Sequence, residues 1–541
     1  MTAAGPGRPA NDLRAPQEDN AALLEPPLSA VPGILAANRA SRRAYDYDVQ
    51  GRALSDLTAQ ARSELLAEAV RYTSAYRDVT SQRASLDSQS DPCILLSGHQ
   101  PQLFHPGVWF KNFVLSGLAR KNQAVAINLV IDNDTLKAAS IRVPGGSIES
   151  PTAGAIEFDL ARPEVPFEER RIADRDVFGS FGQRAAEEIA PLVPAPWVRA
   201  FWPRVLLRSR ESDNLGECLC QARHQVEGEM GLATLELPQG RACALGAFHW
   251  FAAHLLAQLP RFREVYNAAV AEYRKAHRIR SANHPVPDLA AEGQWLEAPF
   301  WVWSSADPRR RRLFARSGGR DTLLSDLGGF QTRLPLSSDG DGAPAVEALI
   351  ALEAGGIKLR TRALTTTLWA RLVLGDLFIH GIGGAKYDAL TDALIERFFG
   401  LAPPAFLTAS ATLRLPISHE RVSDADLLDV RHQLRELTFH PERRLVHPSA
   451  EDRPLIARKQ SWIEREQTRA NAFERCRAIR AANEAMQPRI AEERARLEQS
   501  RAALADRLRA SAILDSREYA FCLHPEKTLF DCLLDISPRT T

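Results

Sequence analysis

Residues 97–107 read SGHQPQLFHPG and follow directly on a short apolar run, CILL, at residues 93–96. After this loop, residues 108–120 have apolar side chains at near-helical spacing, and residues 124–131 form a second, almost continuous apolar run. Strand, loop, helix and strand make a βαβ unit, and unbroken apolar runs are typical of parallel strands buried on both faces. The stretch therefore predicts the start of a parallel sheet.

A second stretch, HGIGGAKYD at residues 380–388, repeats this arrangement. It follows the strand-like residues 374–379, it opens into the helical residues 386–399, and a further strand is expected at residues 405–408. Backbone N–H groups at a helix N-terminus favour a phosphate or a carboxylate. We therefore expect both turns to lie in one sheet and to form the two halves of a nucleotide-type site.

Composition limits the class of protein. A chain of 541 residues is too long for one ordinary core and suggests two or three domains. A formal net charge of +1 argues against a nucleic-acid coat, and no apolar run is long enough to cross a bilayer. The seven cysteines are scattered, and the N-terminus has no apolar signal-peptide core. We expect a reduced, cytoplasmic protein with small-molecule substrates and neither nucleic acid nor membrane as a partner.

The predicted fold class is α/β: a Rossmann-like parallel sheet core with a long insertion, followed by a C-terminal helical hairpin or coiled coil. Long, charged, almost glycine-free segments divided at Pro488 predict the hairpin. Its heptads are poor, which favours a short hairpin or a homodimer contact over a long rod. The expected parts are a flexible tail (1–40), the core (41–415) with its insertion (about 143–355), a connector (416–454), the hairpin (455–512) and a segment packing back on the core (513–541).

The first turn supplies candidate ligands. Gly98 lets the backbone approach a ligand closely, and His99 and His105 could donate hydrogen bonds to phosphate oxygens. Alternatively, the turn is simply rigid and both histidines are satisfied by backbone groups. Asp132 and Asp134 are spaced i and i+2 at a strand tip, so they would lie on one side and bind an amine, sugar hydroxyls or Mg²⁺, or else only form the turn.

The second turn has three glycines, Gly381, Gly383 and Gly384, before a helix. A lysine in a first helical turn opposes the helix dipole, so Lys386 indicates a nearby anion.

Further polar residues have two possible roles. Ser410 and Thr412 could bind a phosphate or a base edge, or serve the turn at a strand end. Arg360 and Arg362 are forked donors for a carboxylate, or surface partners of acidic neighbours.

In order and spacing these motifs resemble those of the cysteine-adding ligases of bacillithiol biosynthesis, the BshC-type family. That family has a Gly-Gln-Gln loop, which corresponds here to residues 98–100 with Gln100, and a following helix with a lysine, which corresponds to Lys111. Its later acidic cluster, glycine-rich loop and serine-containing strand start correspond to residues 132–134, 381–385 and 410–412. The resemblance covers most of the chain after residue 90.

The correspondence is not complete. His99 stands where the family has a glutamine, the acidic cluster lacks the family's histidine, and Lys386 has no counterpart. These departures lie in the expected site, so the fold is implied more firmly than the substrate.

The resemblance implies an ATP-type carbon–nitrogen ligase that joins cysteine to the amine of a sugar–malate-like acceptor, with ATP and Mg²⁺ expected. His99, Asp132 and Asp134 would be the catalytic residues, and the other residues named above would bind nucleotide or substrate. Two alternatives remain: nucleotidyl transfer to another acceptor, and a non-catalytic nucleotide-binding or coiled-coil assembly protein.

Overall fold

The computed structural model of the chain describes residues 13–445 and 447–538. These residues form two compact units: residues up to 143, 155–414 and from 517 onwards make the first, and residues 144–154 and 415–516 make the second. The protein is of the mixed α/β class, as the sequence predicts. Among the helices of the described ranges, none has the length and apolar content needed to cross a bilayer.

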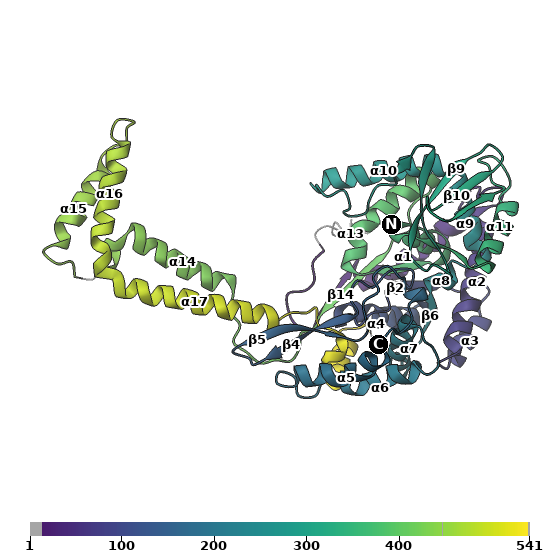
Figure 1. Ribbon diagram of the computed structural model, residues 1–541, viewed down its shortest axis with the longest axis horizontal. Helices are drawn as coiled ribbons and strands as arrows, with labels where there is room; N and C mark the ends of the chain where they lie inside the picture. Colours follow the sequence, from purple (N-terminus) through teal and green to yellow (C-terminus); the bar gives the residue numbers. More distant parts are fainter. Residues whose placement is uncertain (1–12, 446, 539–541) are drawn as a thin grey trace. The chain divides into compact units, whose positions relative to one another are not determined.

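A six-stranded sheet forms the centre of the first unit (Figure 1). β1 runs antiparallel to β14, and the other neighbouring strands are parallel. The strand order reverses between β2 and β13, because β3 and β6 follow on one side of β2, and β13 and β14 lie on the other. In spatial order the strands are β1 (Ala21–Glu25), β14 (Leu407–Thr412), β13 (Leu377–His380), β2 (Ile94–His99), β3 (Val125–Val130) and β6 (Thr234–Pro238).

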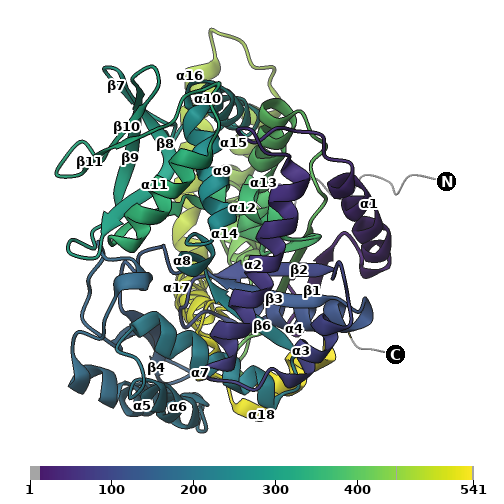
Figure 2. The same ribbon diagram turned by 90° about the vertical axis from the view of Figure 1, so that its right-hand side faces the viewer.

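Helices cover both faces of this sheet (Figure 2). Alternate residues of β2 and β3, among them Ile94, Leu96 and Ile127, face a large apolar core with α2 (Leu54–Ser74) and α9 (Gly246–Ala257). Successive strand residues point to opposite faces, so the residues between them face the other side, where α4 (Pro106–Lys121) packs on the sheet. Burial on both faces explains the continuous apolar runs seen in the sequence.

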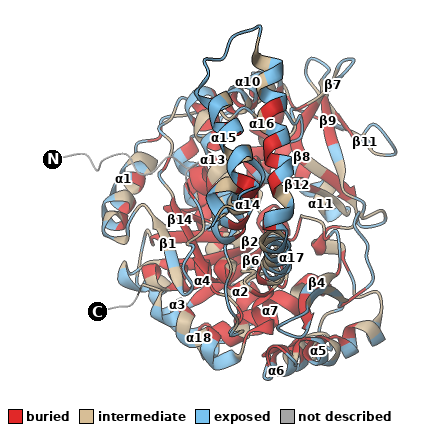
Figure 3. Cartoon of the chain, turned by 90° about the vertical axis from the view of Figure 1, so that its left-hand side faces the viewer, coloured by how far each residue is buried: buried red, intermediate tan, exposed pale blue. Residues whose placement is uncertain are grey.

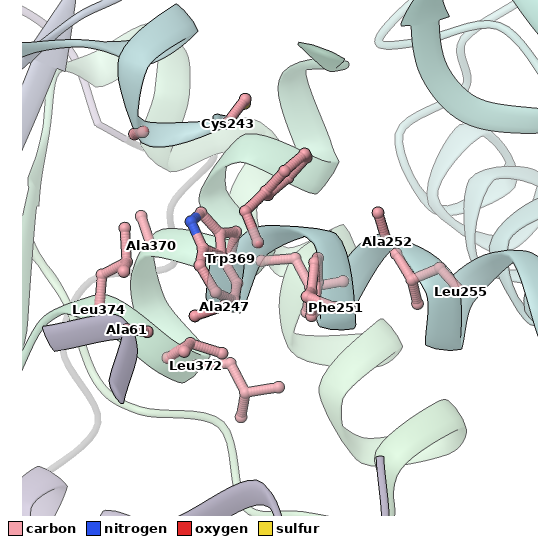
Figure 4. Close-up of a cluster of buried hydrophobic side chains, with 14 of the residues drawn as sticks. Ala61, Cys243, Ala247, Phe251, Ala252, Leu255, Trp369, Ala370, Leu372 and Leu374 are labelled. Atoms are coloured by element: carbon pink, nitrogen blue, oxygen red, sulfur yellow. The ribbon is translucent and has the colours of Figure 1, made fainter. Parts of the chain in front are cut away.

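The apolar core includes residues of α9, of α12 (Ala363–Trp369) and of the π-helical turn that continues α12 (Ala370–Leu374). Trp369 and Phe251 lie together there, with ring centroids 4.9 Å apart, and Ala247 lies beside Trp369 (Figure 4). In Figure 3 the central strands β2, β6 and β14 are buried.

The insertion differs in part from the prediction. It contains the expected hairpin, β8 (Trp295–Ser304) with β9 (Arg311–Ser317), in a second, antiparallel sheet of order β11-β10-β9-β8-β12. The other strands are β7 (Ala291–Glu292, paired with β8), β10 (Thr322–Ser325), β11 (Gln331–Leu334) and β12 (Ile357–Thr361). However, β6 lies within the expected insertion, residues 143–355, and belongs to the central sheet. Only part of that range is therefore inserted.

Residues 13–40 of the expected tail are ordered elements rather than a flexible segment. They hold β1 and most of α1 (Val31–Arg43), and the remainder of the predicted tail, residues 1–12, lies outside the described residues. β1 is defined by its pairing with β14, a contact across almost the whole chain that local composition does not reveal.

The last residues of the first unit pack against α4. Phe521 and Phe530 lie against Trp109, with ring centroids 4.7 and 5.9 Å away, and α18 (Glu526–Asp535) contacts the same helix. This is the place that the sequence analysis expects for the C-terminal segment.

The second unit is helical, but its helices pair differently from the prediction. The first arm of the expected hairpin, from residue 455 to Pro488, is divided into α15 (Asp452–Glu464) and α16 (Ala472–Met486), which pack together. The helix after Pro488, α17 (Ala491–Leu514), packs on α14 (Asp424–Phe439). Thr468 and Asn471 each accept a hydrogen bond from the other's backbone N–H, and this local bonding competes with a helix. The hairpin therefore turns near residue 468 and not at Pro488.

Candidate functional site

The two glycine-containing turns lie side by side. β2 and β13 are adjacent parallel strands, with Ser97 opposite Ile379, so their carboxyl ends meet at one edge of the sheet. Lys111 lies between the turns: its Nζ donates to the carbonyl of Gly98 at 2.7 Å, and its Cδ is 3.9 Å from where a side chain on Gly381 would begin. The structure thus brings together Gly98, Lys111 and Gly381.

The histidines of the first turn are occupied by the protein itself. His99 Nδ1 is 3.2 Å from the carbonyl of Gln100, and burial together with the charge of Lys111 lowers the pKa of His99 to about 3. His105 is the N-cap of α4, where its Nδ1 accepts a hydrogen bond from the backbone N–H of Gly107 at 3.1 Å. Both contacts favour the alternative interpretation, in which backbone groups satisfy the two histidines.

The prediction places Ser410 and Thr412 after a strand. Instead, both residues belong to β14, which continues to Thr412. Ser410 is buried. Thr412 Oγ1 donates to the carbonyl of Pro16 at 2.7 Å and accepts from Arg517 at 3.1 Å. The Thr412 hydroxyl is therefore committed to the protein, and we do not assign it to a ligand.

The second turn is the beginning of a helix rather than a separate loop. Gly381 is the N-cap of α13 (Ile382–Leu394), so Gly383 and Gly384 lie in its first turn. The first helical hydrogen bond runs from the N–H of Ala385 to the carbonyl of Gly381. Lys386 is half-buried, and its carbonyl accepts from Tyr273 at 2.8 Å.

Asp132 and Asp134 line different cavities. β3 ends at Val130, so the two aspartates lie in a turn, and the strand rule that places i and i+2 on one side does not apply. Asp132 accepts from the N–H of Gly240 at 2.7 Å, whereas Asp134 accepts from Gln100 at 2.9 Å and from Arg310 at 2.8 Å. A magnesium ion held jointly by both carboxylates does not fit this arrangement.

The first cavity, of about 280 Å³, lies at the carboxyl ends of β3 and β6 and is rich in charge. Arg360 donates to two carboxylates, Glu168 at 2.7 and 2.8 Å and Glu353 at 2.8 Å, and Lys358 also donates to Glu168. Burial and the nearby charge of Glu168 raise the pKa of Asp132 well above its ordinary range. Asp132 is therefore a carboxyl group that retains its proton at pH values where most aspartates have lost theirs.

The second cavity, of about 220 Å³, lies beside the turns after β2 and β3. Its wall holds the ring of Trp301 with two guanidinium groups beside it: Arg310 lies 4.4 Å and Arg362 4.7 Å from the ring centroid. Gln100 and Asp134 also line it. The cavity therefore combines two cations and an aromatic face with one carboxylate and two amides, those of Gln100 and Asn133.

Three segments, at residues 100–101, 132–134 and 360–362, line both cavities. They contribute Pro101, Asp132 and Arg360 to the first cavity, and to the second cavity Gln100, Asp134 and Arg362. The predicted residues of these segments are thus divided between the two cavities.

Several site residues are missing from the sequence prediction. Glu168 lies in a short 3-10 helix (Phe167–Glu169) within the insertion, and nothing in the local sequence marks it. Arg310 belongs to the run of four arginines at residues 309–312, which resembles a solvated edge strand. Trp301 resembles a core residue, and it becomes recognisable only through the two arginines on its ring.

A buried charge network lies behind the first turn, between α4, β6 and α7 (Leu215–Glu229). Arg223 donates to Glu227 and Glu236, and its guanidinium lies 5.7 Å from the ring centroid of Phe104. The ligand atoms of His224, Glu227 and Glu236 lie close enough together to hold a metal ion. However, both ring nitrogens of His224 already have partners and Arg223 supplies the positive charge, so we assign no metal here.

We expect the aspartates to have opposite effects on pH-dependent stability. A raised folded-state pKa means that Asp132 contributes stability at low pH, which is lost as pH rises through that pKa. Asp132→Asn should therefore reduce the fall in the free energy of unfolding between about pH 5 and about pH 8, measured with urea. Asp134 is the matched control.

Burial works to raise the pKa of Asp134, but the hydrogen bond from Gln100 and the charge of Arg310 outweigh it and lower that pKa. The Asp134→Asn variant should lose stability at both pH values, with its pH slope unchanged over this range. If the free energy of unfolding of Asp132→Asn depends on pH as steeply as that of wild type, the raised pKa assigned to Asp132 is contradicted.

No protein-family model matches the chain, and no curated protein is significantly similar to it.

Proposed function

We propose that the protein is a carbon–nitrogen ligase that uses ATP to join a small amino acid, cysteine by resemblance, to the amine of a sugar–malate-like acceptor. The strand order of the central sheet supports a Rossmann-like core, because β6-β3-β2-β13-β14 corresponds to the order 3-2-1-4-5. Ligands of such sheets bind beyond the carboxyl ends of the strands, where the order reverses. Here that point is the pair of turns around Lys111.

The observation that carries the proposal is the composition of the second cavity. Arg310 and Arg362 are suited to a carboxylate, and Asp134 with Gln100 is suited to an ammonium group. The N–H groups of Arg310 and Arg362 are only partly used within the described residues. At about 220 Å³ the cavity is smaller than the roughly 300–1,000 Å³ typical of drug-sized ligands, which favours an amino acid.

The chemistry requires activation, because a carboxylate does not acylate an amine unaided at neutral pH. A carboxylate oxygen of the amino acid attacks the α-phosphorus of ATP, the bond to pyrophosphate breaks, and an acyl adenylate forms. The acceptor amine attacks the acyl carbon, AMP leaves, and the amine loses a proton. Asp132 in the adjoining cavity, whose pKa burial raises to about 8, is the candidate to accept that proton in its ionised form.

Pyrophosphate release and consumption of cysteine, with ATP, Mg²⁺ and an amino-sugar acceptor, test this proposal. The informative variant is Arg310→Gln, since Arg310 lines the cavity; Arg309→Gln is the matched control, since Arg309 is exposed and binds Asp307. Loss of a charge-assisted hydrogen bond should raise the KM for the amino acid about tenfold or more in Arg310→Gln. Arg309→Gln should behave as wild type.

The proposal fails if wild type neither turns over ATP with any amino acid and amine nor gains thermal stability from ATP with Mg²⁺. It also fails if Arg310→Gln and Arg309→Gln have the same KM for the amino acid.

A further inference from the structure

Two helix N-termini lie at the point where the strand order reverses, and only one of them is open. At α4, His105 accepts the N–H of Gly107, and the carbonyl of Ala411 lies directly against the Cα of Gly107. At α13, no side chain caps the first turn, and nothing lies within 4 Å of where a side chain on Gly383 would begin. An anion that binds at this edge therefore has α13 available and not α4.

A buried histidine is directed at the first turn of α13. His380 ends β13, and its side chain is 4% exposed. Its Nε2 is 2.8 Å from a carboxylate oxygen of Asp388, and its Nδ1 lies 2.8 Å from where a side chain on Gly384 would begin. Among the residues that the structure describes, Nδ1 has no hydrogen-bond partner.

The ammonium group of Lys111 is the second element. The residue is 4% exposed, and within the described ranges its Nζ has a single acceptor, the carbonyl of Gly98, although an ammonium group has three N–H donors. The Lys111 side chain passes close to Gly381, the N-cap of α13. A buried cation with unused donors and an uncapped helix N-terminus both attract negative charge.

We propose that the first turn of α13, together with His380 and Lys111, binds a phosphate-type oxyanion, and that His380 takes up a proton when the anion binds. The inference rests on the proposed function where it places the phosphates of the nucleotide on α13. The anion site itself does not require ligase activity.

The proton uptake follows from the contacts of His380. With Nε2–H donated to Asp388, the neutral ring presents a lone pair at Nδ1, which repels an oxyanion. Protonation at Nδ1 converts this acceptor into a donor to the anion, and the carboxylate of Asp388 balances the charge of the imidazolium ring. Arg371 also binds Asp388, and Lys111 is the further cation at this edge.

Isothermal titration calorimetry with inorganic pyrophosphate, at about pH 7 in buffers of different ionisation enthalpy, tests the proposal. Wild type should bind pyrophosphate and take up a fraction of a proton. His380→Asn should bind about tenfold more weakly, without proton uptake. Lys111→Met should bind about tenfold more weakly but keep the uptake.

Two glycine variants keep the test valid if His380→Asn does not fold. Gly384→Ala places a methyl group against Nδ1 of His380 and should weaken pyrophosphate binding, whereas Gly383→Ala, one residue earlier in the same turn, meets open space and should bind as wild type does. Equal binding by the two variants, or wild-type binding without proton uptake, would overturn the proposal. So would the absence of pyrophosphate binding by wild type.

The outcomes separate this inference from the ligase. Pyrophosphate binding with proton uptake, but no ATP-dependent use of any amino acid, leaves the anion site standing and removes the ligase. Ligase activity with pyrophosphate binding unchanged in His380→Asn removes only the anion site.

Discussion

Replacing Arg223 with methionine is expected to lower the free energy of unfolding by about 3–5 kcal/mol. The guanidinium is the positive charge shared by Glu227 and Glu236, whose side chains are fully buried. Trp109 and Asn112 also donate to Glu227, and Asn128 donates to Glu236, but neutral donors do not balance two buried negative charges. Urea denaturation of wild type and variant measures the loss.

The pH dependence of this loss has a definite sign. Burial raises the pKa of Glu236 even with Arg223 present, because the charge of Arg223 offsets burial only in part. Without Arg223, protonation of the carboxyls relieves the penalty at low pH, so the difference from wild type should be larger at about pH 8 than at about pH 5. Arg204→Met is the control, since Arg204 pairs with Glu229 at the surface, and its effect should stay below about 1 kcal/mol. Equal losses in the two variants would contradict the role of the network.

Asp376→Ala is expected to have a comparable effect, about 3–5 kcal/mol, at the opposite edge of the sheet. The Asp376 side chain is fully buried, accepts from Arg62 at 2.9 Å and from Arg42 at 3.1 Å, and also accepts from the backbone N–H of Ile94 at 2.9 Å. Its removal leaves the buried guanidinium of Arg62 without its closest carboxylate and the first residue of β2 without an acceptor. Thermal and urea unfolding measure the cost.

Asp91 provides the matched control for Asp376. It binds the same arginines, Arg42 and Arg62, but its side chain is 36% exposed. Exposed ion pairs contribute little, so Asp91→Ala should cost about 1 kcal/mol or less. If Asp91→Ala is as destabilising as Asp376→Ala, burial is not what makes Asp376 important.

The strands that the sequence predicts are those whose apolar pattern contains no charged residue, although Asn128 stands within β3. Residues 93–96 mark β2 within three residues of its bounds and residues 124–131 mark β3 within one, because strands buried on both faces have few polar side chains. This pattern does not predict β6, because the charged residue Glu236 lies in the middle of the strand. Arg223 balances the charge of Glu236 there. β1 is also not predicted, because its partner strand is nearly four hundred residues away in the sequence.

The candidate site could be predicted where local geometry decides it. A glycine at the end of a strand places Gly98 and Gly381 at the sheet edge, although Gly98 lies within β2 and only Gly381 opens a helix. The structure brings the two glycines together around Lys111. The roles of Asp132 and Asp134 could not be predicted, since they depend on where β3 ends. Glu168 and Trp301 come from the insertion, so only packing over long sequence distances reveals them.

The pairing of β1 with β14 also has a consequence for biosynthesis. The ribosome makes residues 21–25 early, but their hydrogen-bond partners, residues 408–412, emerge only after most of the chain has been translated. Until then the nascent polypeptide carries an incomplete sheet with an apolar rim, which is a natural substrate for chaperones. Slow or interrupted translation should therefore harm the yield of native protein more than it would for a protein of the same size built from consecutive, self-contained domains.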